Sequence, residues 1–408
     1  MKFSLFRAVK TICVFLCLVL FVSASFLNAE EKIDPVLWKK ALRIHNEAIV
    51  IDTHTDTPMG MLEDNVDIGK PETAGELDLI KMKTGGLDAV FFAVFVSNNR
   101  DDKQPSKDAL NMIDEIYNQV ERYPHLCKLA YSTQDILRIH KEGKRAILIG
   151  IENGGPIEGS LRFLRDYYRL GVRYITLTHN SNNNICDSAT DEKPKWNGLS
   201  PFGKEVVAEM NRIGMLIDIS HVSDKTFWDV LEYSKVPVIA SHSCARSICN
   251  VPRNMTDEMI KALARKGGVI QVNFFSEFVD QEYSQKIKEL QKSLEPVIAK
   301  LRETYKNDRK TYWAEYMKLF KGKKPPAPPM ESLMKHIDHI VKLVGIDYVG
   351  LGSDFDGAAG YPEGLENASG YPLITYHLLK RGYKEAEIKK ILGENFLRVF
   401  KAVEQGAH

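Results

Sequence analysis

Histidine and acidic residues follow short apolar runs at six places in the chain. They are His54 and Asp56 after the first such run, and Glu152, His179, His221, His242 and Asp354 after later ones. One such residue alone would usually be structural, as a hydrogen-bonded side chain or a helix cap. Six runs that end in the same way indicate a shared function, because separate structural causes would not select one end of each run. Imidazoles combined with carboxylates are typical ligands of zinc and similar divalent ions.

The number of these residues exceeds what one ion requires. A single catalytic zinc takes three protein ligands. Two ions about 3.5–4 Å apart that share a carboxylate use a larger set, and they can hold a hydroxide because metal binding lowers the pKa of water to about 7. This chemistry suits hydrolysis. The sequence contains no Gly-x-Ser-x-Gly motif of a serine nucleophile.

The apolar runs themselves predict the fold. We expect strands at 48–53, 89–96, 146–151, 172–178, 215–220, 236–241, 268–273 and 347–353. The runs are continuous rather than alternating, as in parallel strands buried on both faces. Eight strands separated by amphipathic stretches predict an α/β fold of the (β/α)8 TIM barrel type, and no Gly-x-Gly-x-x-Gly turn suggests a dinucleotide fold. In such a barrel the C-terminal strand ends form one rim, where the predicted ligands would meet.

Three of the helices have recognisable limits. Ser200 is a predicted N-cap before Pro201, and Gly214 ends that helix. Two more helices are expected over 257–265 and 384–404. The segment 277–331 departs from the alternation, since it is rich in Lys and Glu and ends in several prolines. We expect a helical insertion between strands seven and eight, either a solvated addition or a lid or oligomer contact at the barrel mouth.

The N-terminus has the features of a targeting segment. Basic residues precede the apolar stretch 12–22, and small residues follow, which predicts a secretory signal peptide over 1–29. The uncharged run 11–29 would also suit an uncleaved membrane anchor. We therefore expect an exported protein, periplasmic or extracellular, with membrane association through the N-terminus in the second case. Residues 30–408 would form a single barrel domain.

Composition excludes some other functions. The 55 Lys and Arg residues nearly balance the 54 Asp and Glu residues, which argues against a nucleic-acid-binding protein. Four cysteines follow the predicted leader, Cys127, Cys186, Cys244 and Cys249. They have no Cys-x-x-Cys spacing typical of a zinc site. In an oxidising compartment they would allow three complete disulfide pairings.

The segments around the candidate ligands resemble the membrane (renal) dipeptidase family, zinc-dependent metallopeptidases of the amidohydrolase-like barrel superfamily. The similar segments are Ile-Asp-Thr-His-Thr-Asp at 51–56, Gly-Ile-Glu at 150–152, Tyr-Ile-Thr-Leu-Thr-His at 174–179, Leu-Ile-Asp-Ile-Ser-His-Val at 216–222, Val-Ile-Ala-Ser-His-Ser at 238–243 and Gly-Leu-Gly-Ser-Asp-Phe-Asp-Gly at 350–357. They occur in the family's order, and the resemblance spans essentially the whole mature chain. It implies hydrolysis of the amide bond of dipeptides by a metal-bridging hydroxide.

The resemblance also implies a role for each residue. Two zinc ions would be held by His54 and Asp56, by His221 and His242, and by Glu152 bridging both. His179 would stabilise the oxyanion and, with the metal, supply positive charge there. Arg253, in Asn-Val-Pro-Arg at 250–253, would bind the free carboxylate of the substrate and so exclude longer peptides. Asp354 would carry the proton from water to the leaving amine, with Asp356 as the alternative.

The chain departs from the family pattern in two ways. The segment 277–331 is longer than the connection in mammalian members, which leaves pocket depth and substrate size open. Asn153 stands after Glu152 where the family often has glycine. Family members commonly dimerise, so a homodimer is among the expectations. Many also accept D-residues at the C-terminal position of the dipeptide, and some open β-lactams.

Two other functions compete with this interpretation. A binuclear hydrolase of N-acyl amino acids or lactones would keep the metal ligands, whereas a substrate without a carboxylate would not need Arg253. A barrel that serves only as a binding scaffold would need none of the ligands, and the complete set argues against it.

Overall fold

The computed structural model describes residues 33–71, 75–97, 104–306 and 308–407. The predicted signal peptide or anchor, 1–29, lies outside these residues. The chain divides into two units, 1–40 and 41–408. Helix α2 (Pro35–Glu47) begins in the first unit, and everything below concerns the second. Within the described part of the chain, no helix is long and apolar enough to cross a membrane.

The sheet is a parallel barrel. Its strands are β1 (Ile51–Thr55), β2 (Ala89–Phe95), β3 (Cys127–Leu129), β4 (Arg145–Glu152), β5 (Val172–Thr176), β6 (Leu216–Asp218), β7 (Ile239–Ala240), β8 (Val269–Val272) and β9 (Val349–Leu351). The order is β1-β2-β4-β5-β6-β7-β8-β9, and a parallel bridge between Thr55 and Phe355 joins the two ends. Each of the eight predicted strands is present, so the predicted (β/α)8 fold is confirmed. Strand β3 is additional and pairs with the first half of β4.

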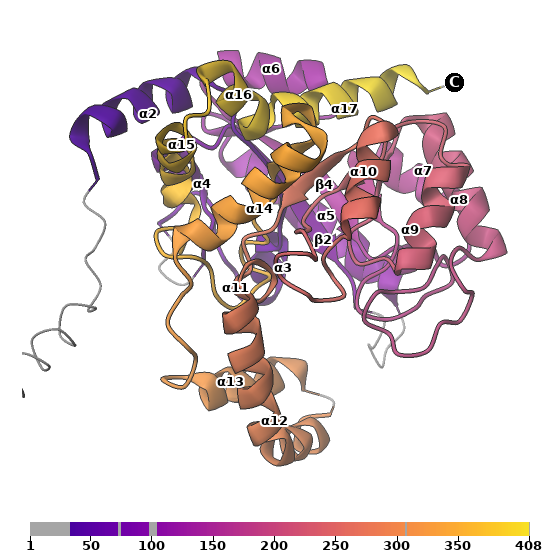
Figure 1. Cartoon of the computed structure of the whole chain (residues 1–408). Helices are drawn as coiled ribbons and strands as arrows, with labels where there is room; N and C mark the ends of the chain where they lie inside the picture. The colour runs from indigo at the N-terminus through magenta and orange to yellow at the C-terminus, as the bar shows by residue number, and fades with distance from the viewer. Residues whose placement is uncertain (1–32, 72–74, 98–103, 307, 408) are drawn as a thin grey trace, which may run out of the picture. The chain divides into compact units, whose positions relative to one another are not determined.

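Helices surround the strands (Figure 1). They are α3 (Thr57–Glu63), α4 (Leu79–Thr84), α5 (Pro105–Arg122), α6 (Thr133–Lys141), α7 (Leu161–Arg169), α8 (Pro201–Ile213), α9 (Asp224–Tyr233), α10 (Asp257–Arg265), α14 (Met330–Val344), α15 (Tyr371–Lys380), α16 (Glu385–Lys389) and α17 (Asn395–Gln405). Helices α8 and α10 have the predicted limits. The Ser200 side chain accepts a hydrogen bond from the Gly203 N–H, and Gly214 has a φ of 75°. The predicted helix over 384–404 consists of α16, a π-helical turn and α17.

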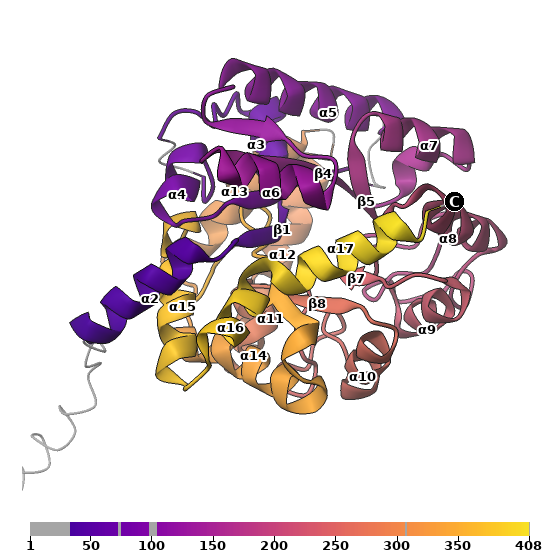
Figure 2. The same ribbon diagram turned by 90° about the horizontal axis from the view of Figure 1, so that it is seen from above.

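Helix α17 closes the N-terminal end of the barrel. Figure 2 shows it crossing over the strands. Its Phe396 and Phe400 rings lie 5.4 Å and 6.5 Å from the ring of Phe91 in β2. These aromatic side chains belong to an apolar cluster inside the barrel, separate from the larger cluster between strands and helices. This end of the barrel is therefore apolar, and polar side chains inside the barrel are expected at the opposite, C-terminal rim.

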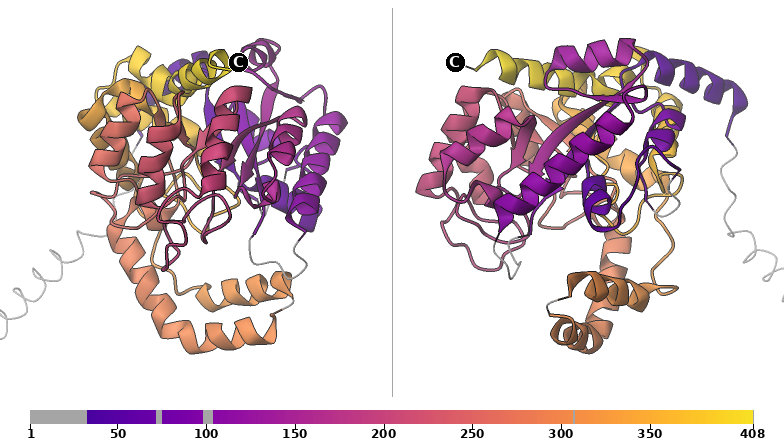
Figure 3. Two further views of the ribbon diagram at one scale, coloured as in Figure 1. Left: turned by 90° about the vertical axis from the view of Figure 1, so that its right-hand side faces the viewer. Right: turned by 180° about the vertical axis from the view of Figure 1, so that it is seen from behind.

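The predicted insertion leaves the barrel after β8. It contains α11 (Ser276–Val279), α12 (Gln281–Thr304) and α13 (Arg309–Phe320), before α14 returns to β9. In Figures 1 and 3 these helices lie on the opposite side of the barrel from α17, which is the side of the C-terminal rim. Most of their described side chains are exposed, including Val297 and Trp313. The insertion therefore lies at the barrel mouth, and its role as a solvated addition, a lid or an oligomer contact stays a prediction.

The four described cysteines are free thiols and all are buried. None of the three predicted disulfide pairings forms in this structure. Burial raises the pKa of Cys127 and of Cys249 to about 12.

Candidate metal centre

The predicted ligands meet at the C-terminal rim. Candidate ligand atoms form three groups, and within each group the atoms lie within 4.8 Å of one another. The groups are His54, Asp56 and Glu152; Glu152, His221 and His242; and His54, His242 and Asp354. His54 is in β1, Glu152 ends β4, and the other residues follow the ends of β1, β6, β7 and β9. The parallel strands therefore bring residues far apart in sequence to one place.

The carboxylate of Glu152 is at the centre of the cluster. Its Oε1 atom lies 3.0 Å from His221 Nε2, 3.5 Å from His242 Nε2, 3.6 Å from His54 Nε2 and 3.8 Å from His179 Nε2. Burial alone would raise the pKa of Glu152. The surrounding imidazoles, His179 and His54 foremost, nevertheless hold it well below its ordinary value. Glu152 is thus a carboxylate shared by two ligand groups.

The cluster has the features of a cation site. His54 Nε2 is buried without a hydrogen-bond partner among the described residues. It lies 3.6 Å from Asp56 Oδ2 and 3.6 Å from Glu152 Oε1. Burial and the charge of Glu152 raise the pKa of Asp56 to about 8, because two buried carboxylates repel each other without a cation between them. A divalent ion would use the ring nitrogen and offset this repulsion, so the donor set fits two such ions.

The other ring nitrogen of each candidate histidine ligand is held by a neighbour. The contacts are His54 Nδ1 to Tyr174 Oη at 2.8 Å, His221 Nδ1 to Asn180 Oδ1 at 3.2 Å, and His242 Nδ1 to Ser241 Oγ at 2.7 Å. An amide oxygen only accepts, so Nδ1 of His221 carries the hydrogen and Nε2 keeps its lone pair. Partners of this kind orient metal-binding histidines and set their tautomer. The roles of Tyr174, Asn180 and Ser241 could not be predicted from the sequence.

Two of these partners depend on further contacts. Ser241 Oγ donates to Asp218 Oδ2 at 2.6 Å, so Ser241 is free to accept the Nδ1–H of His242. Tyr174 reaches His54 by lying across Gly150, where a Cβ atom would be 2.1 Å from Tyr174 Cζ. Gly150 therefore has to lack a side chain for Tyr174 to contact His54.

Several rim residues have a left-handed backbone. The φ angles are 67° at His221, 65° at Asp354, 65° at Asp356 and 75° at Asn153. Such angles are uncommon outside glycine and cluster at functional sites. Nearby, a Cβ at Gly357 would lie 2.0 Å from Asp56 Oδ2 and 2.8 Å from Asp354 Oδ1. The turn after β9 thus brings its backbone against both carboxylates.

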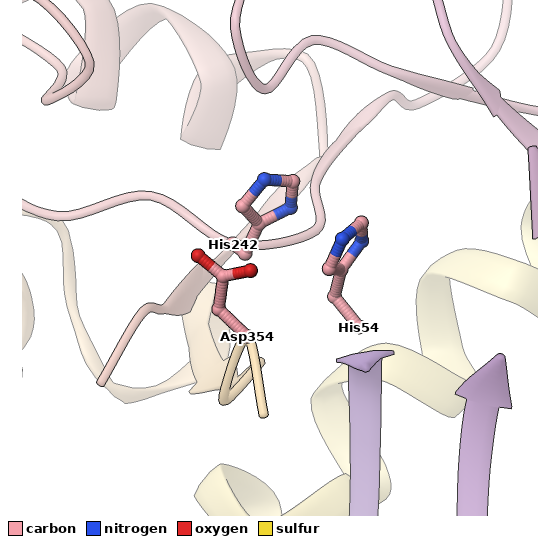
Figure 4. Close-up of side chains that lie close together, drawn as sticks. All are labelled: His54, His242 and Asp354. Atoms are coloured by element: carbon pink, nitrogen blue, oxygen red, sulfur yellow. The ribbon is translucent and has the colours of Figure 1, made fainter. Parts of the chain in front are cut away.

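The structure distinguishes between the two candidate proton carriers. Asp354 lies beside His54 and His242 in Figure 4 and accepts a hydrogen bond from Asn273 Nδ2 at 2.9 Å. Asp356 instead accepts from Thr57 Oγ1 at 2.5 Å and from the Glu76 N–H at 2.6 Å. Asp354, not Asp356, is therefore within the ligand cluster.

His179 lies at the edge of the cluster. Its ring centroid is 4.2 Å from that of His221 and 4.6 Å from that of Phe95. Burial lowers the pKa of His179 to about 4. The positive charge expected of His179 stays a prediction. In either protonation state the ring has an N–H that can donate a hydrogen bond.

Arg253 is buried and only partly satisfied. Its Nη2 donates to the His242 carbonyl oxygen at 3.2 Å, and its Nε has no partner within the described part of the chain. The guanidinium carbon lies 5.4 Å from the centroid of the Phe278 ring. Burial lowers the pKa of Arg253, yet a guanidinium stays charged in proteins. Such a cation beside the cluster suits a carboxylate, which a guanidinium binds through two parallel hydrogen bonds.

Comparisons with known proteins agree with this geometry. The family model of the membrane dipeptidases (peptidase family M19) matches residues 38–408. Dipeptidase tcpJ of Claviceps purpurea (strain 20.1) is 34% identical over 344 residues, 82% of this chain and 71% of its own. Dipeptidase 3 of Rattus norvegicus is 32% identical over 382 residues, 91% of this chain and 68% of its own. The crystal structure of the probable dipeptidase PvdM from Pseudomonas aeruginosa has a TM-score of 0.80 and 27% identity, covering 92% of this chain and 100% of that one.

Proposed function

Since this chain belongs to the membrane dipeptidase family, we propose that it is a zinc-dependent dipeptidase that hydrolyses the amide bond of dipeptides. The two curated relatives above are both named dipeptidases. The observation that carries the proposal is the position of Glu152 in two candidate ligand groups at once. One buried carboxylate between two sets of imidazole and carboxylate donors is the arrangement that a pair of ions needs.

The ligands divide naturally between the two ions. His54 and Asp56 would bind one ion, His221 and His242 the other, and Glu152 both. When bound, the two zinc ions would polarise the substrate carbonyl and lower the pKa of a water molecule so that it attacks as hydroxide. Because Asp354 lies within 4.8 Å of the ring nitrogens of His54 and His242, its carboxylate can accept the proton of the attacking water. Asp354 then passes this proton to the leaving nitrogen.

Arg253 and His179 orient the substrate. Arg253 binds the free C-terminal carboxylate of the dipeptide, because the buried guanidinium has donors to spare. This contact fixes the distance between the carboxylate and the scissile bond, so longer peptides do not fit. His179 donates a hydrogen bond to the carbonyl oxygen as negative charge develops there.

Metal analysis combined with a dipeptidase assay tests the proposal. Purified protein should contain two zinc ions per chain and cleave dipeptides. Chelation should remove the metal and the activity together, and added zinc should restore both. Activity that persists after the metal has been stripped would contradict the mechanism, and zinc well below one ion per chain would favour a scaffold without catalysis.

The same ligands would also serve a hydrolase of N-acyl amino acids or lactones. The under-satisfied Arg253 favours a substrate with a carboxylate over a lactone. Turnover that is unchanged in the Arg253→Ala variant would favour the lactone.

We also propose that the chain is exported and that 1–29 acts as the targeting segment. N-terminal sequencing of the mature protein separates the alternatives, because cleavage after Ala24 or Ala29 gives a soluble form and an intact leader a membrane-bound one. Size-exclusion chromatography with light scattering tests the expected homodimer.

A further inference from the structure

We propose that Asn153 is a positioning residue that fixes the Glu152 carboxylate and the loop carrying His179 relative to each other. This inference rests on the proposed function and extends it to a residue outside the ligand set. Asn153 directly follows Glu152, the last residue of β4.

The backbone conformation at position 153 explains only in part why asparagine stands there. Asn153 has a φ of 75°, a region that asparagine tolerates better than most residues and that glycine adopts freely. Glycine would therefore serve the turn equally well. What asparagine adds at this position is its side-chain amide.

The Asn153 side chain is fully buried and connects three segments. Its Nδ2 donates to the carbonyl oxygen of Val96 at 2.6 Å, immediately after β2. Its Oδ1 accepts from the Gly155 N–H at 3.2 Å and from Asn183 Nδ2 at 3.0 Å. The first contact holds the end of β2, the second holds its own turn, and the third reaches the loop after β5.

Asn183 extends the connection to both sides of His179. Its Nδ2 also donates to the Leu177 carbonyl oxygen at 2.8 Å. Its Oδ1 accepts from the N–H groups of Ile185 at 2.8 Å and Cys186 at 3.1 Å. Leu177 precedes His179 by two residues and Asn183 follows it by four, so one amide clamps both ends of the loop.

A second path leads from Asn153 to the same histidine. Val96, which accepts from Asn153, follows Phe95, and the Phe95 ring packs against His179. Both paths end at His179, whose Nε2 lies 3.8 Å from Glu152 Oε1. Without the amide of Asn153, the strand that carries Glu152 would remain, but the His179 loop and Phe95 would lose their common anchor.

The variant Asn153→Gly tests this role because it keeps the left-handed backbone and removes only the amide. We expect kcat for a dipeptide to fall by about 10–100-fold, as for the loss of partners that orient metal ligands. KM should change by less than about twofold and zinc should stay at two per chain, because Arg253 and the ligands are untouched. The matched control is Asn65→Gly, since Asn65 is exposed and has a φ of 57°; its kcat should equal that of the wild type.

A double-mutant cycle separates positioning from general structural support. In a His179→Ala background, Asn153→Gly should lower kcat by less than about twofold more, because its effect acts through His179. Equal losses in both backgrounds, or a normal kcat in the single variant, would overturn the inference.

A crystal structure of zinc-loaded Asn153→Gly gives a readout independent of turnover. The His179 ring should be displaced from Glu152 relative to the wild type, and an unmoved ring would refute the role. If the wild type cleaves no dipeptide, the proposed function fails, while this structural comparison still decides the inference.

Discussion

At the residue scale, the site is organised around a single oxygen atom, Glu152 Oε1. Four imidazole nitrogens lie within 3.8 Å of it, and the carboxylate of Asp56 belongs to one of the two ligand groups that contain Glu152. A negative charge at this point is compatible with folding because the imidazoles stabilise it, and with function because a cation can replace that stabilisation. Most consequences of substitution at the rim follow from this arrangement.

Replacing the shared carboxylate should remove metal binding in both groups. In Glu152→Gln the bridging charge is lost and shape is kept, so zinc affinity should fall by more than the 10–100-fold typical of outer partners. Zinc content after dialysis measures this. The matched control is Glu158→Gln, an exposed residue just after the same strand, which should retain two ions; full occupancy in Glu152→Gln would contradict the shared-ligand role.

Truncating Arg253 should affect substrates according to their charge. Loss of one partner of a buried charge pair costs about 2–5 kcal/mol, so kcat/KM for a dipeptide should fall by about 30-fold or more in Arg253→Ala. A dipeptide amide, which lacks the carboxylate, should be cleaved equally slowly by variant and wild type. Equal losses for both substrates would show that Arg253 does not recognise the carboxylate.

The contact between Tyr174 and His54 should raise the affinity of the zinc site that contains His54. Tyr174→Phe removes the hydroxyl 2.8 Å from His54 Nδ1, and zinc affinity should fall by about 10–100-fold. Competition with a chelator measures the change. Tyr131→Phe, which removes an exposed hydroxyl on the outside of the barrel, should leave the affinity unchanged.

The sequence predicted which residues lie at the rim better than it predicted their surroundings. His54 and Glu152 were expected at the rim because parallel strands end together, and they lie there. Asp354 was preferred to Asp356 as the proton carrier. Both flank Phe355, and Asp354 lies within the cluster, whereas Asp356 bonds to Thr57 and Glu76. The burial of His179 could not be predicted, because it depends on Phe95 and His221, which are remote in sequence.

At the scale of elements, the buried histidine of α14 forms hydrogen bonds to two connecting segments on the side of the C-terminal rim. His336 in α14 accepts from the Ala245 N–H at 3.1 Å through Nδ1, and its Nε2 donates to the Val279 carbonyl oxygen at 3.0 Å. The neutral ring satisfies both contacts. Protonation would put a hydrogen on Nδ1 and break the first, in agreement with burial lowering the pKa of His336 to about 4.

Acid should therefore weaken the fold through His336. The folded-state pKa lies below the unfolded value of about 6.5, so the contribution is complete above pH 6.5 and is lost as the pH falls toward 4. We expect this histidine alone to cost about 2–3 kcal/mol of unfolding free energy over that range. Denaturant titrations of wild type and His336→Gln at pH 7 and pH 4.5 measure it; the same pH dependence in both would exclude His336 as the cause.

The elements show which sequence signals are reliable. Continuous apolar runs located every barrel strand, including β7, which has only two paired residues. Strand β3 was missed because Cys-Lys-Leu is too short to form a run and pairs only at the edge of β4. The caps of α8 were predicted because a serine before proline and a glycine in a left-handed turn act locally.

At the scale of the whole barrel, residues 41–408 have one apolar end and one polar end. Helix α17 closes the first with Phe396 and Phe400, and the second carries the ligand cluster and the insertion. The fold could be predicted from chain order because each strand and helix pair repeats the same step. The path of the insertion after β8 could not, since the few apolar residues in its Lys- and Glu-rich helix α12, such as Tyr283 and Ile287, do not specify which part of the chain they pack against.

The four buried thiols can report local unfolding of the barrel. Cysteines sealed in the interior, with pKa values raised by burial, react with alkylating reagents only when the surrounding segments unfold. Cys127 lies on β3, Cys186 in the loop after β5, and Cys244 and Cys249 after β7, so the sites sample different parts of the barrel. Mass spectrometry of timed alkylation would show which part loosens first, with no engineered label.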